Sequence, residues 1–192
     1  MIHKARIEIN QKSALFLDRD GVINRRLIGE YVRNWDEFEF LPGVFEALKI
    51  FQGLFSRIFI VTNQQGIGKG LMTGDDLTLI HQRMLKEISR NGGRIDRIYY
   101  CPDLAGTGSK YRKPQPGMAL QAAAEFPDIN LESSVMVGDG EGDIGFASNA
   151  GMQSVFIEAQ SFEMQNMNPQ PTIIVKDLLS FALLIQEQNK TV

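Results

Sequence analysis

The sequence predicts an α/β protein organised around a doubly wound, Rossmann-like parallel sheet. Two observations favour this class: short apolar runs alternate with helical patterns along the chain, and polar clusters stand where several of these runs end. A chain of 192 residues, of which 43% are hydrophobic, is long enough for one core, and neither a repeat nor a linker divides it. We therefore expect one domain over residues 1–192.

Six short segments are predicted to be strands. The first, residues 14–18, holds four consecutive apolar residues bounded by charge and glycine, as expected of a buried strand. The segment before it is ambiguous, although the alternation over residues 6–10 could form a short edge strand. The other five strands are expected at residues 57–61, 97–101, 135–137, 154–157 and 172–175.

Helical patterns fill most of the segments between these strands. The clearest has apolar residues at helical spacing from Leu77 to Ile88, after a start at Thr73 that resembles a capping box, and Gly92 helps to end it. Residues 66–70 are rich in glycine but match no phosphate-binding fingerprint, so we expect a flexible rim loop there. The other helices are expected at residues 43–51, 117–126 and 143–150 and from residue 177, with loops at 25–40 and 102–116.

The composition excludes several function classes. A net charge of −3 provides no basic surface for nucleic acid, and no run approaches the roughly 18 apolar residues of a membrane span. The single cysteine, Cys101, rules out an internal disulfide and suits a reducing cytoplasm, and two distant histidines, His3 and His81, do not suggest a zinc site. We expect a cytoplasmic protein with a small-molecule partner and no nucleic-acid or membrane partner; the sequence does not indicate an oligomeric state.

Polar side chains follow four of the predicted strands. They are Asp18 and Asp20 after the first strand, Thr62 and Asn63 after the second, Arg112 and Lys113 in the loop after the third, and Asp139 after the fourth. Because parallel strands end at one rim of a sheet, carboxylates, a hydroxyl, an amide and cations should meet there. This combination suits phosphoryl transfer and a bound Mg²⁺. A pair such as Asp18 and Asp20 alone is more often a solvated strand end, so the other clusters decide the interpretation.

The same clusters resemble the four motifs of the haloacid dehalogenase (HAD) superfamily. The motifs are DRDGVIN at residues 18–24, VTNQ at 61–64, RKP at 112–114 and GDGEGD at 138–143. Within the superfamily, they are similar to the branch of phosphatases that act on D-glycero-D-manno-heptose 1,7-bisphosphate and histidinol phosphate. The resemblance covers about residues 14–157 and implies a HAD-like fold without a cap domain, because core elements fill both segments in which the superfamily inserts caps.

This resemblance implies a role for each motif residue. Asp18 would attack phosphorus and form an aspartyl-phosphate, and Asp20 would protonate the leaving group and then activate water. Mg²⁺ would be held by the carboxylate of Asp18, the backbone carbonyl of Asp20 and Asp139. Thr62 and Lys113 complete the implied catalytic set. The implied substrate-binding residues are Asn24, Arg25, Asn63, Gln64 and Arg112.

Several neighbouring polar residues also have a purely structural interpretation. Asp143 could cap the next helix or orient Lys113 rather than bind metal, and Glu141 is expected to face solvent. His81 lies on the long helix and is expected to pack rather than react. The residues that could contact a second anionic group, or equally belong to the surface, are Arg25, Arg26 and Tyr31.

Two departures from the branch bear on the substrate. The branch commonly binds zinc with cysteines and a histidine before its RKP motif, whereas here only Cys101 stands there, so residues 102–111 cannot build that site. Gly140 and Gln65 replace a lysine and a small hydroxyl residue that relatives often carry. The resemblance implies a Mg²⁺-dependent phosphomonoesterase that removes the 7-phosphate of D-glycero-D-manno-heptose 1,7-bisphosphate. The alternatives are a phosphatase of histidinol phosphate or another small sugar phosphate and, more remotely, a non-catalytic phosphate-binding protein.

Overall fold

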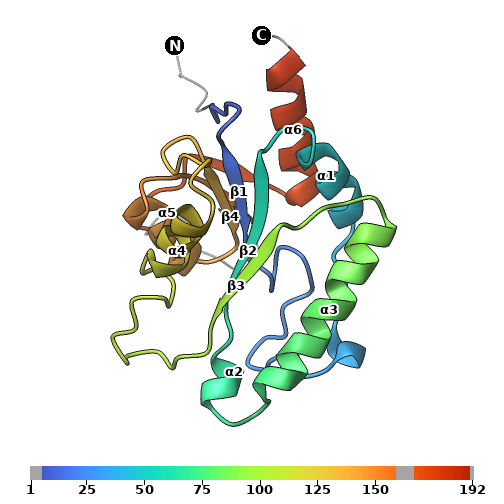
Figure 1. The fold of residues 1–192 in the computed structure, drawn as a ribbon, viewed down its shortest axis with the longest axis vertical. Coiled ribbons are helices and arrows are strands. Elements are labelled where there is room, and N and C mark those ends of the chain that lie inside the picture. The colour runs from blue at the N-terminus through green and yellow to red at the C-terminus, as the bar shows by residue number, and fades with distance from the viewer. Residues whose placement is uncertain (1–5, 159–166, 191–192) are drawn as a thin grey trace.

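The computed structural model describes residues 6–158 and 167–190, and a parallel sheet runs through them (Figure 1). Its strand order is β3-β2-β1-β4-β5-β6, which is the order of a doubly wound, Rossmann-like sheet and confirms the predicted class. The strands are β1 (Ala14–Leu17), β2 (Arg57–Asn63), β3 (Arg97–Cys101), β4 (Val135–Gly138), β5 (Gln153–Ile157) and β6 (Ile173–Val175).

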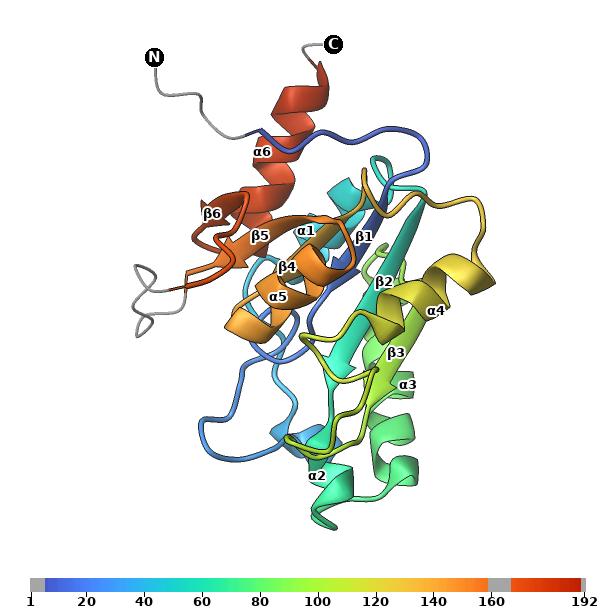
Figure 2. The same cartoon turned by 90° about the vertical axis from the view of Figure 1, so that its left-hand side faces the viewer.

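Helices cover both faces of this sheet (Figures 1 and 2). One face packs against α1 (Val44–Phe51), α3 (Gly74–Arg90) and α6 (Leu178–Lys190), and the other against α4 (Gly117–Glu125) and α5 (Glu141–Asn149). Each helix buries one apolar stripe, so the sheet separates two hydrophobic cores.

The central strand β1 contributes to both cores. Leu15 and Leu17 belong to the core under α1, α3 and α6, whereas Phe16 belongs to the core under α4 and α5. The ring of Phe16 lies 5.1 Å from the ring of Phe59 and 6.5 Å from that of Phe146. Burial of each large apolar side chain stabilises the fold by about 1.5–3 kcal/mol, so the end of β1 is held firmly in place.

Two helices that flank the site begin with side-chain caps. At α3 the hydroxyl of Thr73 accepts a hydrogen bond from the backbone of Asp76 at 3.1 Å, and the carboxylate of Asp76 accepts one from the backbone of Thr73 at 2.8 Å. This is the capping box that the sequence predicts. At α5 the carboxylate of Asp143 accepts a hydrogen bond from the backbone of Gly140 at 3.1 Å.

The structure differs from the predicted elements in three places. Residues 6–10 form no strand, because the backbone of Glu8 is hydrogen bonded to the side-chain amide of Gln153 at 2.7 and 2.8 Å rather than to a neighbouring strand. The expected flexible loop at 66–70 instead contains a short helix, α2 (Gln65–Gly68). A 3₁₀ helix, η1 (Trp35–Glu37), also interrupts the loop at 25–40, and His3 lies outside the described residues.

No separate cap interrupts the fold between the motifs. The segment from Asp20 to Thr62 forms η1, α1 and β2, and the segment from Asn63 to Lys113 forms α2, α3 and β3. The rim at the end of β1 is therefore bordered by loops, by α2 and by the first turn of α5. None of the helices in the described ranges is long and apolar enough to cross a bilayer.

Candidate active site

The predicted motifs meet at the carboxyl ends of β1, β2 and β4. Strand β1 pairs in parallel with β2 on one side and with β4 on the other, so the order in which the chain adds strands to the sheet reverses beside it. Ligands of doubly wound folds bind at this position. A cavity of about 500 Å³ opens at this point. Its lining includes most of the predicted site residues, namely Asp18, Asp20, Thr62, Asn63, Arg112 and Lys113.

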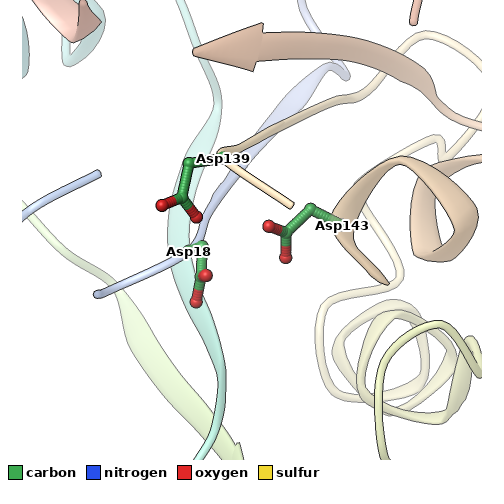
Figure 3. Close-up of side chains that lie close together, drawn as sticks. All are labelled: Asp18, Asp139 and Asp143. Carbon is green, nitrogen blue, oxygen red and sulfur yellow. The ribbon is translucent and has the colours of Figure 1, made fainter. Parts of the chain in front are cut away.

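A cluster of three buried carboxylates forms the floor of the site. Asp18 follows β1, Asp139 follows β4 and Asp143 lies in the first turn of α5, and Figure 3 shows them close together. One oxygen from each carboxylate lies within 4.8 Å of the others. Oxygen ligands of this kind are those that Mg²⁺ prefers.

Lys113 is the cation at the centre of this cluster. Its Nζ lies 2.8 Å from Asp18 and 2.6 Å from Asp143, and it donates a third hydrogen bond to the carbonyl of Val61 at 2.8 Å. Burial lowers the pKa of Lys113, but the charges of Asp143 and Asp18 outweigh this effect and raise it above its ordinary value. Asp143 thus both orients Lys113 and caps α5, the two structural roles expected of it.

The single charge of Lys113 does not fully compensate the three carboxylates of the cluster. Burial and the charge of Asp143 raise the pKa of Asp18 to about 6, although Lys113 opposes the shift. Burial and the charge of Asp18 raise the pKa of Asp139 to about 7, against the opposing charge of Arg26. Two carboxylates with raised pKa values indicate a place where an additional cation would be stabilised.

Arg26 lies where the carboxylates of Asp18 and Asp139 would stabilise an additional cation. Its Nη2 lies 2.6 Å from Asp139 Oδ1, 3.6 Å from Asp18 Oδ2 and 3.1 Å from the backbone carbonyl of Asp20. These are the three groups predicted to hold Mg²⁺. A positively charged group therefore already lies on this set of oxygens, and the set fits a divalent cation.

The second aspartate of the first motif is held separately from the cluster. Arg19 donates hydrogen bonds of 2.9 Å to both carboxylate oxygens of Asp20, and Asn24 and Gln64 donate one each at 2.9 and 3.0 Å. Burial raises the pKa of Asp20, but Arg19 and these hydrogen bonds outweigh it and lower the pKa below its ordinary value. Asn24 and Gln64, predicted to bind substrate, are buried here and orient Asp20 instead of lining the cavity.

His81 lies behind Asp20 on α3. Its Nε2 is 3.3 Å from Nη1 of Arg19, and burial together with the charge of Arg19 lowers its pKa to about 3. The ring is therefore neutral and supports Arg19, in agreement with the expected packing role. Sequence reasoning did not single out Arg19, although its position between two motif aspartates could have suggested it.

The other predicted substrate-binding residues fall into two groups. Asn63 exchanges hydrogen bonds of 3.0 and 3.1 Å with the backbone of Lys113 and lines the cavity beside Thr62. Arg112 also lines the cavity, with one N–H donated to the carbonyl of Asp103. Arg25, by contrast, is exposed, pairs with Glu39 at 2.8 Å and does not line the cavity.

Contacts between side chains hold the two ends of the loop before Arg112 together. The thiol of Cys101 lies 3.5 Å from the carboxylate of Asp103 and 3.6 Å from the hydroxyl of Ser109. That hydroxyl also accepts a hydrogen bond from the backbone of Tyr111 at 3.3 Å. These contacts join the two ends of the loop next to the cavity.

Comparison with known proteins identifies the family. The model of a HAD-hydrolase-like family matches residues 110–181. The D-glycero-alpha-D-manno-heptose-1,7-bisphosphate 7-phosphatase of Mycobacterium tuberculosis is 44% identical over 135 residues, which are 70% of this chain and 71% of the relative. The D-glycero-beta-D-manno-heptose-1,7-bisphosphate 7-phosphatase of Vibrio cholerae is 41% identical over 148 residues, which are 73% of this chain and 78% of that relative.

A solved structure extends this similarity over nearly the whole fold. The D,D-heptose 1,7-bisphosphate phosphatase of B. bronchiseptica, complexed with magnesium and phosphate, superposes with a TM-score of 0.83 and 28% identity. The alignment covers 92% of this chain and 99% of that structure. The motif residues gather at the end of β1, and the relatives match the chain at this level of identity and coverage. The chain therefore belongs to the heptose-bisphosphate phosphatase family of HAD-like hydrolases.

Proposed function

We propose that this protein is a Mg²⁺-dependent phosphatase that removes the 7-phosphate of D-glycero-D-manno-heptose 1,7-bisphosphate. The observation that carries the proposal is the arrangement around Asp18, a buried carboxylate at a strand end with Lys113 bonded to it at 2.8 Å. The names of the relatives from M. tuberculosis and V. cholerae supply the substrate, and they differ in the anomer.

Asp18 is proposed to be the nucleophile. Its carboxylate attacks phosphorus, the P–O bond to the sugar breaks, and an aspartyl-phosphate forms. Lys113 reduces the repulsion between this carboxylate and the incoming phosphate, because its charge lies beside the oxygen Oδ1. The backbone N–H of Arg19 donates to the same oxygen at 2.7 Å, which fixes the orientation of the carboxylate.

Asp20 is proposed to transfer the protons of the reaction. It gives a proton to the departing sugar oxygen and later takes one from the water that hydrolyses the aspartyl-phosphate. The lowered pKa keeps Asp20 ionised in the free protein, so it must bind a proton when the substrate arrives. Its three side-chain partners, Arg19, Asn24 and Gln64, hold the carboxylate in one orientation for both steps.

The other groups would position the phosphate. Thr62 and Asn63 line the cavity at the end of β2 and would donate hydrogen bonds to phosphate oxygens, and Arg112 would contribute a cation. Asp18, Asp139 and the carbonyl of Asp20 would hold Mg²⁺, whose charge would neutralise the phosphate oxygens. We further propose that the enzyme acts on this small molecule in the cytoplasm, which its single cysteine, Cys101, suits.

Phosphate release from a substrate panel tests this proposal. The panel contains both anomers of the heptose bisphosphate, histidinol phosphate and simple hexose phosphates, each assayed with Mg²⁺ and with a chelator. We expect metal-dependent release with a preference for one heptose bisphosphate anomer. A preference for histidinol phosphate, or equal weak release from all compounds, would contradict the proposed substrate. Release that persists in the chelator would contradict the proposed metal dependence.

A further inference from the structure

Gln64 is buried between β2 and α2 and does not line the cavity. It is 2% exposed, and its backbone N–H donates to the carbonyl of Cys101 at 2.7 Å, which fixes where its side chain starts. The amide nitrogen Nε2 lies 3.0 Å from Asp20 Oδ2 and 2.8 Å from Thr62 Oγ1. One amide group therefore joins a side chain of the first motif to a side chain of the second.

The carboxylate of Asp20 fixes the direction of both hydrogen bonds. Arg19 donates to both of its oxygens, so Asp20 is an acceptor and the group that Gln64 turns toward it is the NH₂. An amide NH₂ carries two hydrogens, and with one on Asp20 the other points at the Thr62 oxygen. Thr62 therefore accepts a hydrogen bond from Gln64 and cannot donate its own proton in that direction.

Within the described residues, the Thr62 hydroxyl has no acceptor for its own proton. A hydroxyl carries one donor and two acceptor sites, and the bond from Gln64 uses an acceptor site. No further hydrogen bond of this hydroxyl forms with residues 6–158 or 167–190. Thr62 lines the cavity, so its proton is available to an acceptor there, such as a phosphate oxygen.

We propose that Gln64 is a positioning residue that makes Thr62 a donor to the reacting phosphate while it holds Asp20 for proton transfer. This inference rests on the proposed function and assigns a task to a residue that does not line the cavity. Because a single amide group makes both contacts, loss of Gln64 disturbs phosphate binding and proton transfer together. Asn24 provides the contrast, since its amide donates to Asp20 Oδ1 at 2.9 Å and not to Thr62.

Two measurements separate the two contacts. The Kd of inorganic phosphate, measured by calorimetry with Mg²⁺ present, reports on the phosphate site without requiring turnover. The kcat and KM for heptose 1,7-bisphosphate report on the reaction, in which Asp20 transfers protons. The melting temperature of each variant shows whether it is folded.

A double-mutant cycle tests whether Gln64 acts on phosphate through Thr62. Thr62→Val removes the hydroxyl and should raise the Kd of phosphate about tenfold, the effect of one hydrogen bond to a charged acceptor. Gln64→Met keeps the length of the side chain but donates no proton, and it should raise this Kd about threefold. When Thr62→Val is already present, Gln64→Met should raise it no further, because the hydroxyl that it directs is gone.

The effect on the reaction distinguishes Gln64 from Asn24. Gln64→Met and Asn24→Leu each remove one donor from Asp20, so each should lower kcat about tenfold. Asn24→Leu should leave the Kd of phosphate at its wild-type value. If Gln64→Met does not fold, Gln64→Glu takes its place in the cycle, because a glutamic acid donates at most one proton and cannot serve both oxygens.

The possible failures are distinguishable. If the Gln64 variant leaves the Kd of phosphate unchanged, or raises it equally with and without Thr62→Val, Gln64 does not act through Thr62. The inference is then refuted and the proposed function stands. If Asn24→Leu raises this Kd as much as the Gln64 variant does, the effect comes from Asp20 and the inference is refuted as well. A wild-type protein that binds phosphate but hydrolyses no heptose bisphosphate would contradict the proposed function, while the cycle of Kd values would still decide the role of Gln64.

Discussion

Replacement of Arg26 by glutamine should strengthen the binding of Mg²⁺ to the protein in the absence of substrate. The guanidinium of Arg26 contacts Asp139 at 2.6 Å, Asp18 at 3.6 Å and the carbonyl of Asp20 at 3.1 Å. A metal ion that uses the same oxygens must first displace it. Glutamine keeps much of the length of the side chain but removes the charge that competes with the metal.

The size of the effect follows from the contact that the metal breaks. A hydrogen bond between charged groups contributes about 1.5–3 kcal/mol. The side chain of Arg26 is 46% exposed, so solvent screening reduces this contribution to about 1 kcal/mol. Removal of the competitor should therefore lower the Kd of Mg²⁺ about fivefold.

Isothermal titration calorimetry with Mg²⁺ measures this change directly. Arg25→Gln is the matched control, because the neighbouring Arg25 pairs with the exposed Glu39 and does not contact the cluster. We expect a lower Kd for Arg26→Gln and an unchanged Kd for Arg25→Gln. A Kd for Arg26→Gln that equals or exceeds the wild-type value would refute the reasoning, since it would mean that Arg26 does not compete with the metal.

Three further changes probe the same cluster. Lys113→Met should lower the free energy of unfolding by about 3–5 kcal/mol in urea titrations, because Asp18 and Asp143 would be buried without their cation. Gly21→Ala should weaken Mg²⁺ binding in calorimetry, because a Cβ there would overlap the carboxylate of Asp139 and the backbone φ of +97° disfavours alanine. The affinity for Mg²⁺ should rise between pH 5 and pH 8, because Asp139 and Asp18, with pKa values raised to about 7 and 6, must lose their protons to bind a metal. These raised values also stabilise the metal-free fold at low pH, because the folded state keeps protons that the unfolded state loses above its ordinary carboxyl pKa of 3.8. The melting temperature of the metal-free protein should therefore fall as the pH rises from about 4 to about 7.

Each of these expectations has a result that would contradict it. A melting temperature of the metal-free protein that stays constant or rises between about pH 4 and pH 7 would mean that the two carboxyls do not keep their protons in the fold. Lys113→Met with wild-type stability would mean that the two carboxylates are not forced to share a buried cation. Gly21→Ala with wild-type metal affinity would mean that Asp139 does not have to stay beside Gly21. An affinity for Mg²⁺ that is constant from pH 5 to pH 8 would show that the carboxylates bind the metal without releasing protons.

The positions of the main site residues could be predicted because they depend on features that are local in sequence. The apolar run at 14–17 is buried on both faces, as its composition requires, and this places Asp18 at the rim. The run at 135–138 places Asp139 beside it, because parallel neighbouring strands end on the same side. These placements need only the strand pattern and the direction of the sheet.

The strand pattern alone could not show which of Arg25 and Arg26 faces the cavity. The two residues are adjacent and chemically identical, and only the path of the loop decides which one faces the cavity. An isolated bridge joins Asn24 to Phe40, and the backbone of Arg25 donates to the carbonyl of Glu39 at 2.8 Å. This pairing leaves Arg25 beside Glu39 and Arg26 over the carboxylates, and it depends on residues far along the chain.

The helix α2 was missed for a related reason. With four residues it is too short to show a helical pattern, and its glycines favour a loop when they are considered alone. Its stability depends on Tyr31, which packs against Gly66 and bonds to Gln65 from a distant part of the sequence. Gln65 and Lys69, which belong to α2 and follow it, line the cavity, so the element that sequence reasoning could not find borders the active site.

The central claim is that Asp18 attacks phosphorus, and mass spectrometry of acid-quenched protein tests it most directly. The protein is mixed with Mg²⁺ and heptose 1,7-bisphosphate, quenched within the first turnovers and digested. For the wild-type protein, we predict an acyl phosphate on the peptide that contains Asp18. A folded Asp18→Asn variant should form no such adduct and release no phosphate. A phosphorylated residue elsewhere in the chain, or turnover by Asp18→Asn at the wild-type rate, would contradict the mechanism.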